Sequence, residues 1–535
     1  MEPLCKLARL DCANEGVEGT PGGFANHRCF FSRGDHTYKV PLELHAQNRA
    51  KVVERVRATL TNGAGAVLVF RGGVSRERDD TDHEELFRQE SYFQYLFGVK
   101  EPNWWGAIDV CTSEARLYAP KLPPAYAVWM GHIATLDALR ERYGVDVAWT
   151  DGLATSLPPG GVALCMRGVN SDSGVDIADA LPIEESLAMP SPELFVAIAD
   201  CRAVKSAAEL DLMRYVSYAT SRAHVAVMRS TKPGDYEYQL EARFLGRIAE
   251  DHGCRNCAYT SICACGPNSA VLHYGHAGAP NDRRLAESDV ALLDMGAEYH
   301  CYCSDVTCSF PVRGVFDDRQ RAIHGGVLAA QRAVMGAMKP GVSWAAMHEL
   351  AEATILDALV DAGVLVGKVE DMLACHLAAV FMPHGLGHLI GLDTHDVGGY
   401  LPGMPPRATR PGLGKLRTAR VLQAGMALTV EPGIYFIPAL IEPALQDARR
   451  HFFNLGRLDD FRGFGGVRLE DVVAVTTDGV VNLTLCPRTT DEIESVMAGG
   501  SWPPPTDTAP WLFRSWCTYD AQGVCRALDL PPTAF

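Results

Sequence analysis

Four acidic residues inside apolar, strand-like stretches constrain the fold of this chain more than any other sequence feature. Asp294 and Asp305 lie eleven positions apart, and Glu431 and Glu470 follow in two later stretches of the same kind. Carboxylates are rarely buried without a partner. The chain must therefore fold so that each of these side chains meets a cation, either a nearby arginine or a bound metal ion.

A histidine in a glycine-rich segment completes the candidate set. His388 ends the segment 382–388, which holds two glycines and a second histidine. A neutral imidazole binds metal through one ring nitrogen, although a histidine packed in a core is the commoner case. Residues 296–299 have the composition of a turn, which would place Asp294 and Asp305 side by side on neighbouring strands.

Two aspartates, two glutamates and one histidine make an oxygen-rich ligand set. Carboxylate oxygens suit manganese, magnesium or iron(II) better than thiophilic metals. The set holds more carboxylates than one ion needs, which predicts two ions about 3.5–4 Å apart that share ligands. The H-E-x-x-H pattern of many zinc peptidases is absent from the sequence. The residues that we expect to bind metal are Asp294, Asp305, His388, Glu431 and Glu470.

The length of 535 residues is too great for one ordinary core, so we expect two domains. Strand-like and helical segments alternate over 37–204, which predicts an α/β domain. Long helices and separate strand-like stretches over 205–499 predict an α+β domain. We interpret residues 1–36 as a loosely ordered extension and residues 500–535 as an irregular tail.

Apolar periodicity and capping residues predict the main elements. Ser206 and Glu209 form a capping box, after which apolar residues recur every three or four positions. The Lys-Pro-Gly sequence at 339–341 ends another helix. The predicted helices cover 42–60, 133–143, a stretch beginning at 206, a stretch from 317 or 318 to 338, and 344–362. The predicted strands are 67–70, 106–110, 162–166, 290–295, 427–431 and 467–475.

The formal net charge of −16 argues against nucleic acid or an anionic membrane as a partner. The N-terminus lacks the apolar stretch of a signal peptide, and no run of 18 apolar residues is present. We therefore expect a cytoplasmic protein that does not bind membranes.

The 17 cysteines do not have the pattern of a secreted disulfide framework. Cys254 and Cys257 have the spacing of half a zinc site, but Cys263 and Cys265 are too close together to supply the other half. We expect free thiols, with a structural zinc or a redox pair as the alternatives.

Around these acidic residues the sequence resembles the prolidase family, the Xaa-Pro dipeptidases of the pita-bread superfamily that also contains creatinase and methionine aminopeptidase. The similarity extends over about residues 37–499, and so many motifs in one order are more specific than any motif alone. The segments that carry it are 88–91, 97–99, 129–131, 273–282, 381–391, 416–420 and 461–468.

The resemblance implies an α/β N-terminal domain of the creatinase type, which mediates dimerisation, and a pita-bread catalytic domain of the α+β class. It also implies two divalent metal ions per subunit, manganese in this family, and hydrolysis of Xaa-Pro dipeptides by a metal-bridging hydroxide. Asp305 and Glu470 would bridge the ions, and Asp294 would bind one of them. His388 and Glu431 would serve one ion, and Glu431 would also pass a proton to the leaving amine.

The remaining implied roles concern the substrate and the second subunit. His273, His395 and Arg417 match substrate-binding residues of the family, and His395 is also a catalytic candidate. Trp129 matches an aromatic residue that the family places near the site across a homodimer interface.

Two other functions stay open at this point. An aminopeptidase P, which removes the first residue from longer Xaa-Pro peptides, would share the fold and the ligands. A catalytically inactive pita-bread protein that binds partners is an alternative of another class, but such relatives lose metal ligands and all five positions are intact here. The sequence departs from the family at Val472, where a further acid is common.

Overall fold

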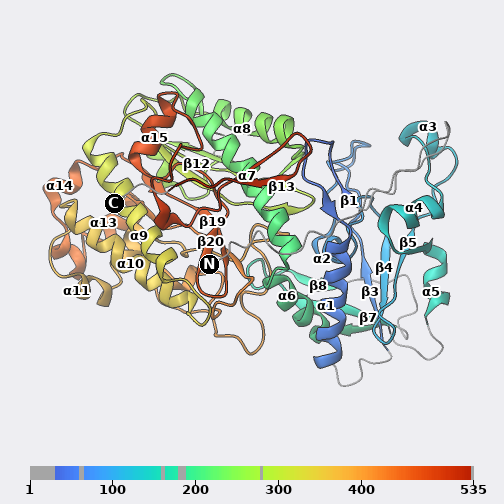
Figure 1. Ribbon diagram of the computed structural model, residues 1–535. Helices are drawn as coiled ribbons and strands as arrows, with labels where there is room; N and C mark the ends of the chain where they lie inside the picture. The colour runs from blue at the N-terminus through green and yellow to red at the C-terminus, as the bar shows by residue number, and fades with distance from the viewer. Residues whose placement is uncertain (1–29, 60–65, 158–162, 179–187, 277–280, 532–535) are drawn as a thin grey trace.

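The computed structural model describes residues 30–59, 66–157, 163–178, 188–276 and 281–531, and Figure 1 shows a smaller N-terminal part beside a larger C-terminal part. The smaller part contains one mixed sheet with the strand order β6-β5-β4-β3-β7-β8, and β9 pairs with β7. Its strands are β3 (Val67–Arg71), β4 (Trp105–Asp109), β5 (Ala115–Ala119), β6 (Asp146–Trp149), β7 (Ala163–Val169), β8 (Asp176–Ala178) and β9 (Ala188–Ser191).

Short helices accompany this sheet, and α1 packs against both α2 and α6. Thr135 caps the helix α4 through its hydroxyl, so that α4 begins three residues later than the sequence predicts. The helices are α1 (Glu43–Thr59), α2 (Ser91–Phe97), α3 (Tyr126–Met130), α4 (Leu136–Tyr143), α5 (Leu153–Ser156) and α6 (Pro192–Ala203). The strand β1 (Phe30–Phe31) pairs with β2 (Val40–Pro41), whereas residues 1–29 of the predicted extension lie outside the described residues.

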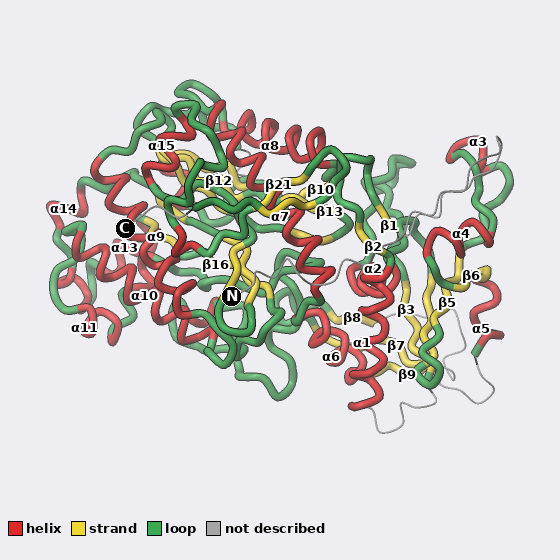
Figure 2. The backbone as a smooth tube through the Cα atoms, viewed as in Figure 1, coloured by secondary structure: helices red, strands yellow, loops and turns green. Residues whose placement is uncertain are grey.

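The larger part surrounds several short sheets with helices (Figure 2). The capping box of Ser206 and Glu209 begins α7, as predicted. The longer helices are α7 (Ala207–Ser230), α8 (Glu237–His252), α9 (Asp318–Ala337) and α10 (Trp344–Asp361), and the shorter ones are α11 (Val369–Ala374), α12 (Ala378–Phe381), α13 (Pro438–Ala444), α14 (Leu455–Asp459) and α15 (Thr490–Met497). None of the described helices is both long and apolar enough to span a lipid bilayer.

Two groups of strands carry the acidic residues. The first group packs against α7 and α8, and it comprises β10 (Asn256–Cys257), β11 (Ile262–Cys265), β12 (Val290–Asp294), β13 (Ala297–Tyr299), β14 (Tyr302–Cys303) and β15 (Thr307–Pro311). The second group packs against α9, and it comprises β16 (Ala427–Val430), β17 (Gly433–Tyr435), β18 (Gly466–Arg468), β19 (Asp471–Val475) and β20 (Val480–Asn482).

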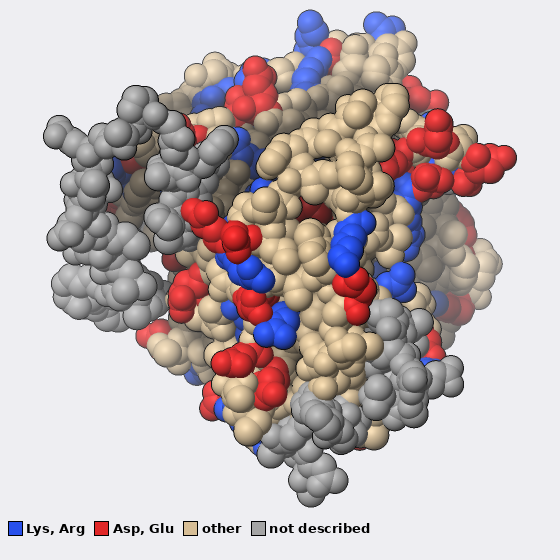
Figure 3. Space-filling view, turned by 90° about the vertical axis from the view of Figure 1, so that its right-hand side faces the viewer, with Lys and Arg blue, Asp and Glu red and all other residues tan. Residues whose placement is uncertain are grey.

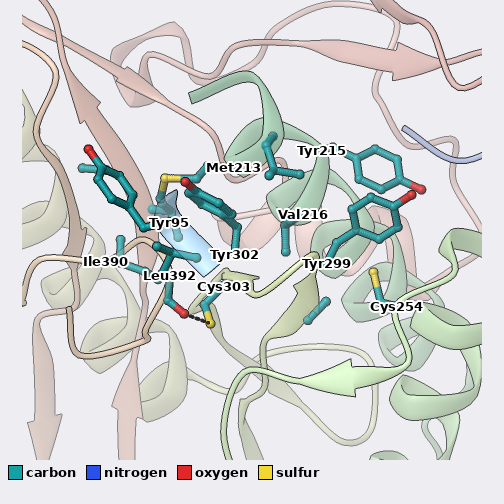
Figure 4. Close-up of a cluster of buried hydrophobic side chains, with 14 of the residues drawn as sticks. Tyr95, Met213, Tyr215, Val216, Cys254, Tyr299, Tyr302, Cys303, Ile390 and Leu392 are labelled. Atoms are coloured by element: carbon teal, nitrogen blue, oxygen red, sulfur yellow. Dashed lines mark hydrogen bonds between the residues drawn. The ribbon is translucent and has the colours of Figure 1, made fainter. Parts of the chain in front are cut away.

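The hydrophobic core runs without interruption from the smaller part into the larger one. Tyr95 of α2, Met213 of α7 and Tyr302 of β14 lie close together in this core (Figure 4). The Cys303 thiol donates a hydrogen bond of 3.5 Å to the Leu392 carbonyl oxygen within the same cluster. This shared burial fixes the position of the N-terminal sheet relative to the rest of the molecule.

The surface charge is mixed on the face shown in Figure 3. Among the residues that the structure describes, lysine and arginine side chains there lie interspersed with aspartate and glutamate side chains. The seven cysteines between Cys254 and Cys308 carry free thiols, and most of them are buried.

Two local predictions are wrong, and both errors concern where a strand stops. The stretch 467–475 divides into β18 and β19, because β18 pairs with β17 whereas β19 pairs with β16. Residues 297–299 form β13 instead of a turn, and the chain reverses at His300 and Cys301, both with positive φ. Asp294 still comes close to Asp305, because Asp294 pairs with Thr307 in the ladder of β12 and β15.

The C-terminal tail is more regular than the sequence predicts. It forms a hairpin of β21 (Cys517–Tyr519) and β22 (Cys525–Ala527). Asn482 of β20 donates its N–H to Phe513 and accepts from the N–H of Ser515, at 2.8 Å each. Residues 513–515 of the tail thus pair with the edge strand β20, and the sequence pattern alone does not show this pairing.

One buried arginine joins the two groups of strands. Arg488 donates hydrogen bonds to the carbonyl oxygens of Thr307 (2.9 Å) and Glu470 (2.6 Å) and to the carboxylate of Asp471. Both side chains of the Arg488–Asp471 pair are 1% exposed. Because a buried ion pair that loses one partner leaves an uncompensated charge, this contact has a large effect on stability.

We expect the substitution Arg488→Met to lower the free energy of unfolding by about 3–5 kcal/mol, the scale for breaking a buried pair. Urea unfolding followed by circular dichroism measures this change. Arg462→Met is the matched control, since Arg462 pairs with Asp459 at the surface, and it should leave the urea midpoint unchanged. Equal midpoints for both variants would contradict the role assigned to Arg488.

Candidate metal centre

Three of the predicted ligands come together as one buried group. The ligand atoms of Asp305, His388 and Glu470 all lie within 4.8 Å of one another. His388 Nε2 is 3.3 Å from Asp305 Oδ2 and 3.5 Å from Glu431 Oε1, so Glu431 borders the same group. Each acid lies where a strand stops or starts: Asp305 precedes β15, Glu431 follows β16, and Glu470 separates β18 from β19.

The orientation of His388 leaves one ring nitrogen directed at the carboxylates. Its Nδ1 lies 3.1 Å from the Leu389 carbonyl oxygen, so Nδ1 carries the proton and Nε2 keeps its lone pair. Its backbone N–H donates to the Thr429 hydroxyl. A side chain at Gly387 would meet the Thr429 carbonyl oxygen at 2.1 Å, which explains the glycine beside this ligand. Burial lowers the pKa of His388 to about 4, so the ring is neutral at pH 7.

Asp294 is part of a hydrogen-bonded network that the sequence does not reveal. Its Oδ2 accepts from the Arg468 guanidinium at 2.6 Å, and its Oδ1 accepts from the Tyr259 hydroxyl at 2.5 Å. Arg468 also donates to Thr307, whose hydroxyl in turn donates to Glu470 at 2.7 Å. For each acid, a salt bridge to an arginine was the alternative to a bound metal ion, and Asp294 does form such a salt bridge. Arg468 could have been found, because it lies two residues before Glu470 in a resembling segment.

The electrostatics of the group favour a bound cation. Burial, and then repulsion from neighbouring carboxylates, raises the pKa of Asp305, Glu431 and Glu470 well above the ordinary range. Asp305 Oδ1 is buried and has no hydrogen-bond partner among the residues that the structure describes. Carboxylate oxygens and an imidazole that converge in this way are a donor set that fits divalent metal ions.

Of the predicted substrate residues, His395 lies against this group. The ring of His395 is perpendicular to that of His388, with centroids 4.5 Å apart, and the pKa of His395 lies below the ordinary value. Burial also lowers the pKa of His273, and the charges of Arg468 and Arg417 act in the same direction. The positive charge of Arg417 likewise lowers the pKa of His388 and of His395.

Trp129 is not part of this group within one chain. It lies on α3, at the end of the molecule away from the strands that carry the acids (Figure 1), and it is 84% exposed. Val128 and Met130 on the same helix are exposed as well.

Comparison with known families and proteins agrees with this geometry. Residues 211–477 match metallopeptidase family M24, and residues 45–160 match the aminopeptidase P N-terminal domain. The chain is 49% identical to the Xaa-Pro dipeptidase of Homo sapiens over 479 residues, which cover 88% of this chain and 96% of that protein. It is 36% identical to a probable Xaa-Pro aminopeptidase of Verticillium alfalfae, with 85% and 96% covered.

Solved structures show the same fold. Pseudomonas aeruginosa aminopeptidase PepP is similar with a TM-score of 0.69 and 30% identity, over 86% of this chain and 98% of that one. Escherichia coli aminopeptidase P with the inhibitor Pro-Leu is similar with a TM-score of 0.69 and 26% identity, over 86% and 99%. The predicted architecture, an α/β N-terminal domain and a pita-bread catalytic domain, is confirmed. The sequence and the fold together show that this chain belongs to metallopeptidase family M24.

Proposed function

We propose that this protein is an Xaa-Pro dipeptidase that works with two divalent metal ions, manganese by preference. The observation that carries the proposal is the buried convergence of Asp305, His388 and Glu470 in a chain 49% identical to an Xaa-Pro dipeptidase. The two ions would be held by Asp294, Asp305, His388, Glu431 and Glu470, with Asp305 and Glu470 shared between them. When bound, such ions activate water and polarise the carbonyl of the scissile bond.

The residues of this chain would prepare the metal ligands and move the proton. The Arg468 network fixes both oxygens of Asp294, and the Thr307 hydroxyl fixes one oxygen of Glu470. Glu431 borders His388, and burial raises its pKa well above the ordinary range. A carboxylate in this place is suited to take a proton and deliver it to the leaving amine.

Recognition of proline needs contacts other than a strand-like ladder. The nitrogen of an Xaa-Pro bond carries no proton, so the bond interrupts the backbone hydrogen bonds by which extended peptides are held. Arg417 would instead bind the free carboxylate of the dipeptide, because its planar guanidinium matches a carboxylate. His273 and His395, whose pKa values lie below the ordinary value, would offer neutral rings to the substrate.

An aminopeptidase P activity is the second candidate. The two similar solved structures named above are aminopeptidases P, and they share the fold over 86% of this chain. The higher identity to Xaa-Pro dipeptidases, 49% against 36%, favours the dipeptidase. We further propose a cytoplasmic homodimer in which α3 of one subunit brings Trp129 to the other, since the exposed apolar residues of α3 suit an interface.

We expect metal-stripped protein to release proline from Gly-Pro only after manganese is added, with little activity on Gly-Leu. The substitution Glu470→Gln should lower kcat/KM by about 100-fold or more, because loss of a group that only supports a metal ligand already costs about 10- to 100-fold. Glu442→Gln, at the surface, is the matched control and should retain full activity. Cleavage of a longer Xaa-Pro peptide but not of Gly-Pro would favour aminopeptidase P, and full turnover by Glu470→Gln would contradict the ligand assignment.

The raised pKa values of the acids predict how metal-free protein responds to pH. A group whose pKa is higher in the folded state stabilises the fold fully below its unfolded pKa, about 4 for a carboxyl. That stabilisation is lost as pH rises through the folded pKa. We therefore expect added manganese to raise the melting temperature more at pH 8 than at pH 6, because it binds the deprotonated ligands. Thermal unfolding of wild type and of Glu470→Gln measures this, and an equal rise at both pH values in wild type would contradict it.

A further inference from the structure

A tightly built turn of the N-terminal domain faces Arg417, the candidate substrate-binding arginine. The turn joins β7 to β8, and Asn170 organises it: its side-chain oxygen accepts from the N–H groups of Asp172 and Ser173, at 2.9 Å each. The backbone N–H of Asn170 donates to the Val175 carbonyl oxygen, and the N–H of Gly174 donates to the Asn170 carbonyl oxygen. The backbone of Asp172 is therefore held in one place.

Arg407 attaches this turn to the segment that carries Arg417. One guanidinium nitrogen of Arg407 donates to Asp172 Oδ1 at 2.7 Å, and the other donates to the Leu416 carbonyl oxygen at 2.7 Å. The guanidinium of Arg407 also lies over the ring of Tyr400, 4.3 Å from its centroid, and the Tyr400 hydroxyl donates to the same Leu416 oxygen. The turn and the residue before Arg417 thus share one rigid support.

The second oxygen of Asp172 faces Arg417 itself. Asp172 Oδ2 is 3.6 Å from Arg417 Nη1, and the two side chains are 18% and 31% exposed. This distance is an ion pair without a hydrogen bond. None of the Arg417 guanidinium N–H groups donates a hydrogen bond to any residue in the described part of the chain. Arg417 is therefore oriented by a fixed negative charge and keeps its donors for another anion.

We propose that Asp172 is a positioning residue that holds Arg417 for the free carboxylate of a dipeptide and disfavours peptides that continue beyond proline. This inference rests on the proposed function. A dipeptide places a carboxylate on Arg417, next to Asp172. A longer peptide places an uncharged amide there, and its next residue must pass the turn that Arg407 holds in position. The N-terminal domain would thus select substrate length although it supplies no metal ligand.

The charges of the pair also reach the candidate centre. Asp172 and Arg417 both act on the imidazoles of His388 and His395, with opposite sign.

The test is a double-mutant cycle in the manganese-loaded enzyme, with Gly-Pro and Gly-Pro-Gly as substrates. We expect Asp172→Asn to raise KM for Gly-Pro about tenfold, the scale of a contact to a charged group, with kcat changed less than about twofold. The ratio of kcat/KM for Gly-Pro-Gly to that for Gly-Pro should rise about tenfold, and Asp172→Glu should recover part of the loss. In an Arg417→Ala background the further change Asp172→Asn should have no effect on Gly-Pro, because residues that act as a unit are not additive.

The matched control is Asp176→Asn on the neighbouring strand β8. Asp176 pairs with Arg167 at 2.6 Å in an exposed salt bridge, so this variant should keep wild-type constants and wild-type length preference. Additive effects of Asp172→Asn and Arg417→Ala, or an unchanged preference for length, would overturn the inference. A uniform fall of kcat on both substrates together with a lower melting temperature would show a merely structural role and would also overturn it. Absence of Gly-Pro hydrolysis by the wild type would instead overturn the proposed function.

Discussion

The buried guanidinium of Arg488 is the contact on which the arrangement of the acidic residues depends. It joins the carbonyl oxygen of Thr307, in one group of strands, to that of Glu470, in the other. A surface ion pair would not hold the two groups of strands together in this way, because water can replace its partners. A buried cation must keep all of its protein partners. Asp471 supplies the counter-charge, and Asn482 fixes the second oxygen of Asp471 at 2.8 Å. The two groups of strands are thereby held at the spacing that brings Asp305 and Glu470 together.

Near Arg488 the fold places several carboxylates close together, which is electrostatically unfavourable. Asp305 and Glu470 are buried, and Glu431 beside them is 17% exposed. Desolvation and repulsion between these carboxylates raise the pKa of all three. Arg468 offsets part of this repulsion through Asp294, and Thr307 connects Arg468 to Glu470. Such sites cost stability in the free protein and become favourable when cations bind, which couples metal binding to the stability of the fold.

The N-terminal domain belongs to the same physical unit as the centre. A continuous core that includes Tyr95 and Tyr302 fixes its position, and the turn at Asp172 uses that fixed position to face Arg417. A domain that supplies none of the candidate metal ligands can in this way shape the surroundings of the candidate metal centre. The placement needs both a rigid turn and a rigid interface, since a flexible connection would not hold two charges 3.6 Å apart.

The sequence by itself determined the long helices, the candidate acidic residues and the family, because these depend on local signals. The capping box at Ser206 and the apolar positions of α7 lie within a few residues of one another, and an acid in an apolar strand stands out without knowledge of its partners. Only the tertiary structure decided where strands stop and which distant groups meet. The break at Glu470 depends on pairing with β16 and β17, and Arg468, Arg488 and Asp172 gain their roles from partners far away in the chain. No local pattern records such partners, because burial and pairing are properties of the assembled fold.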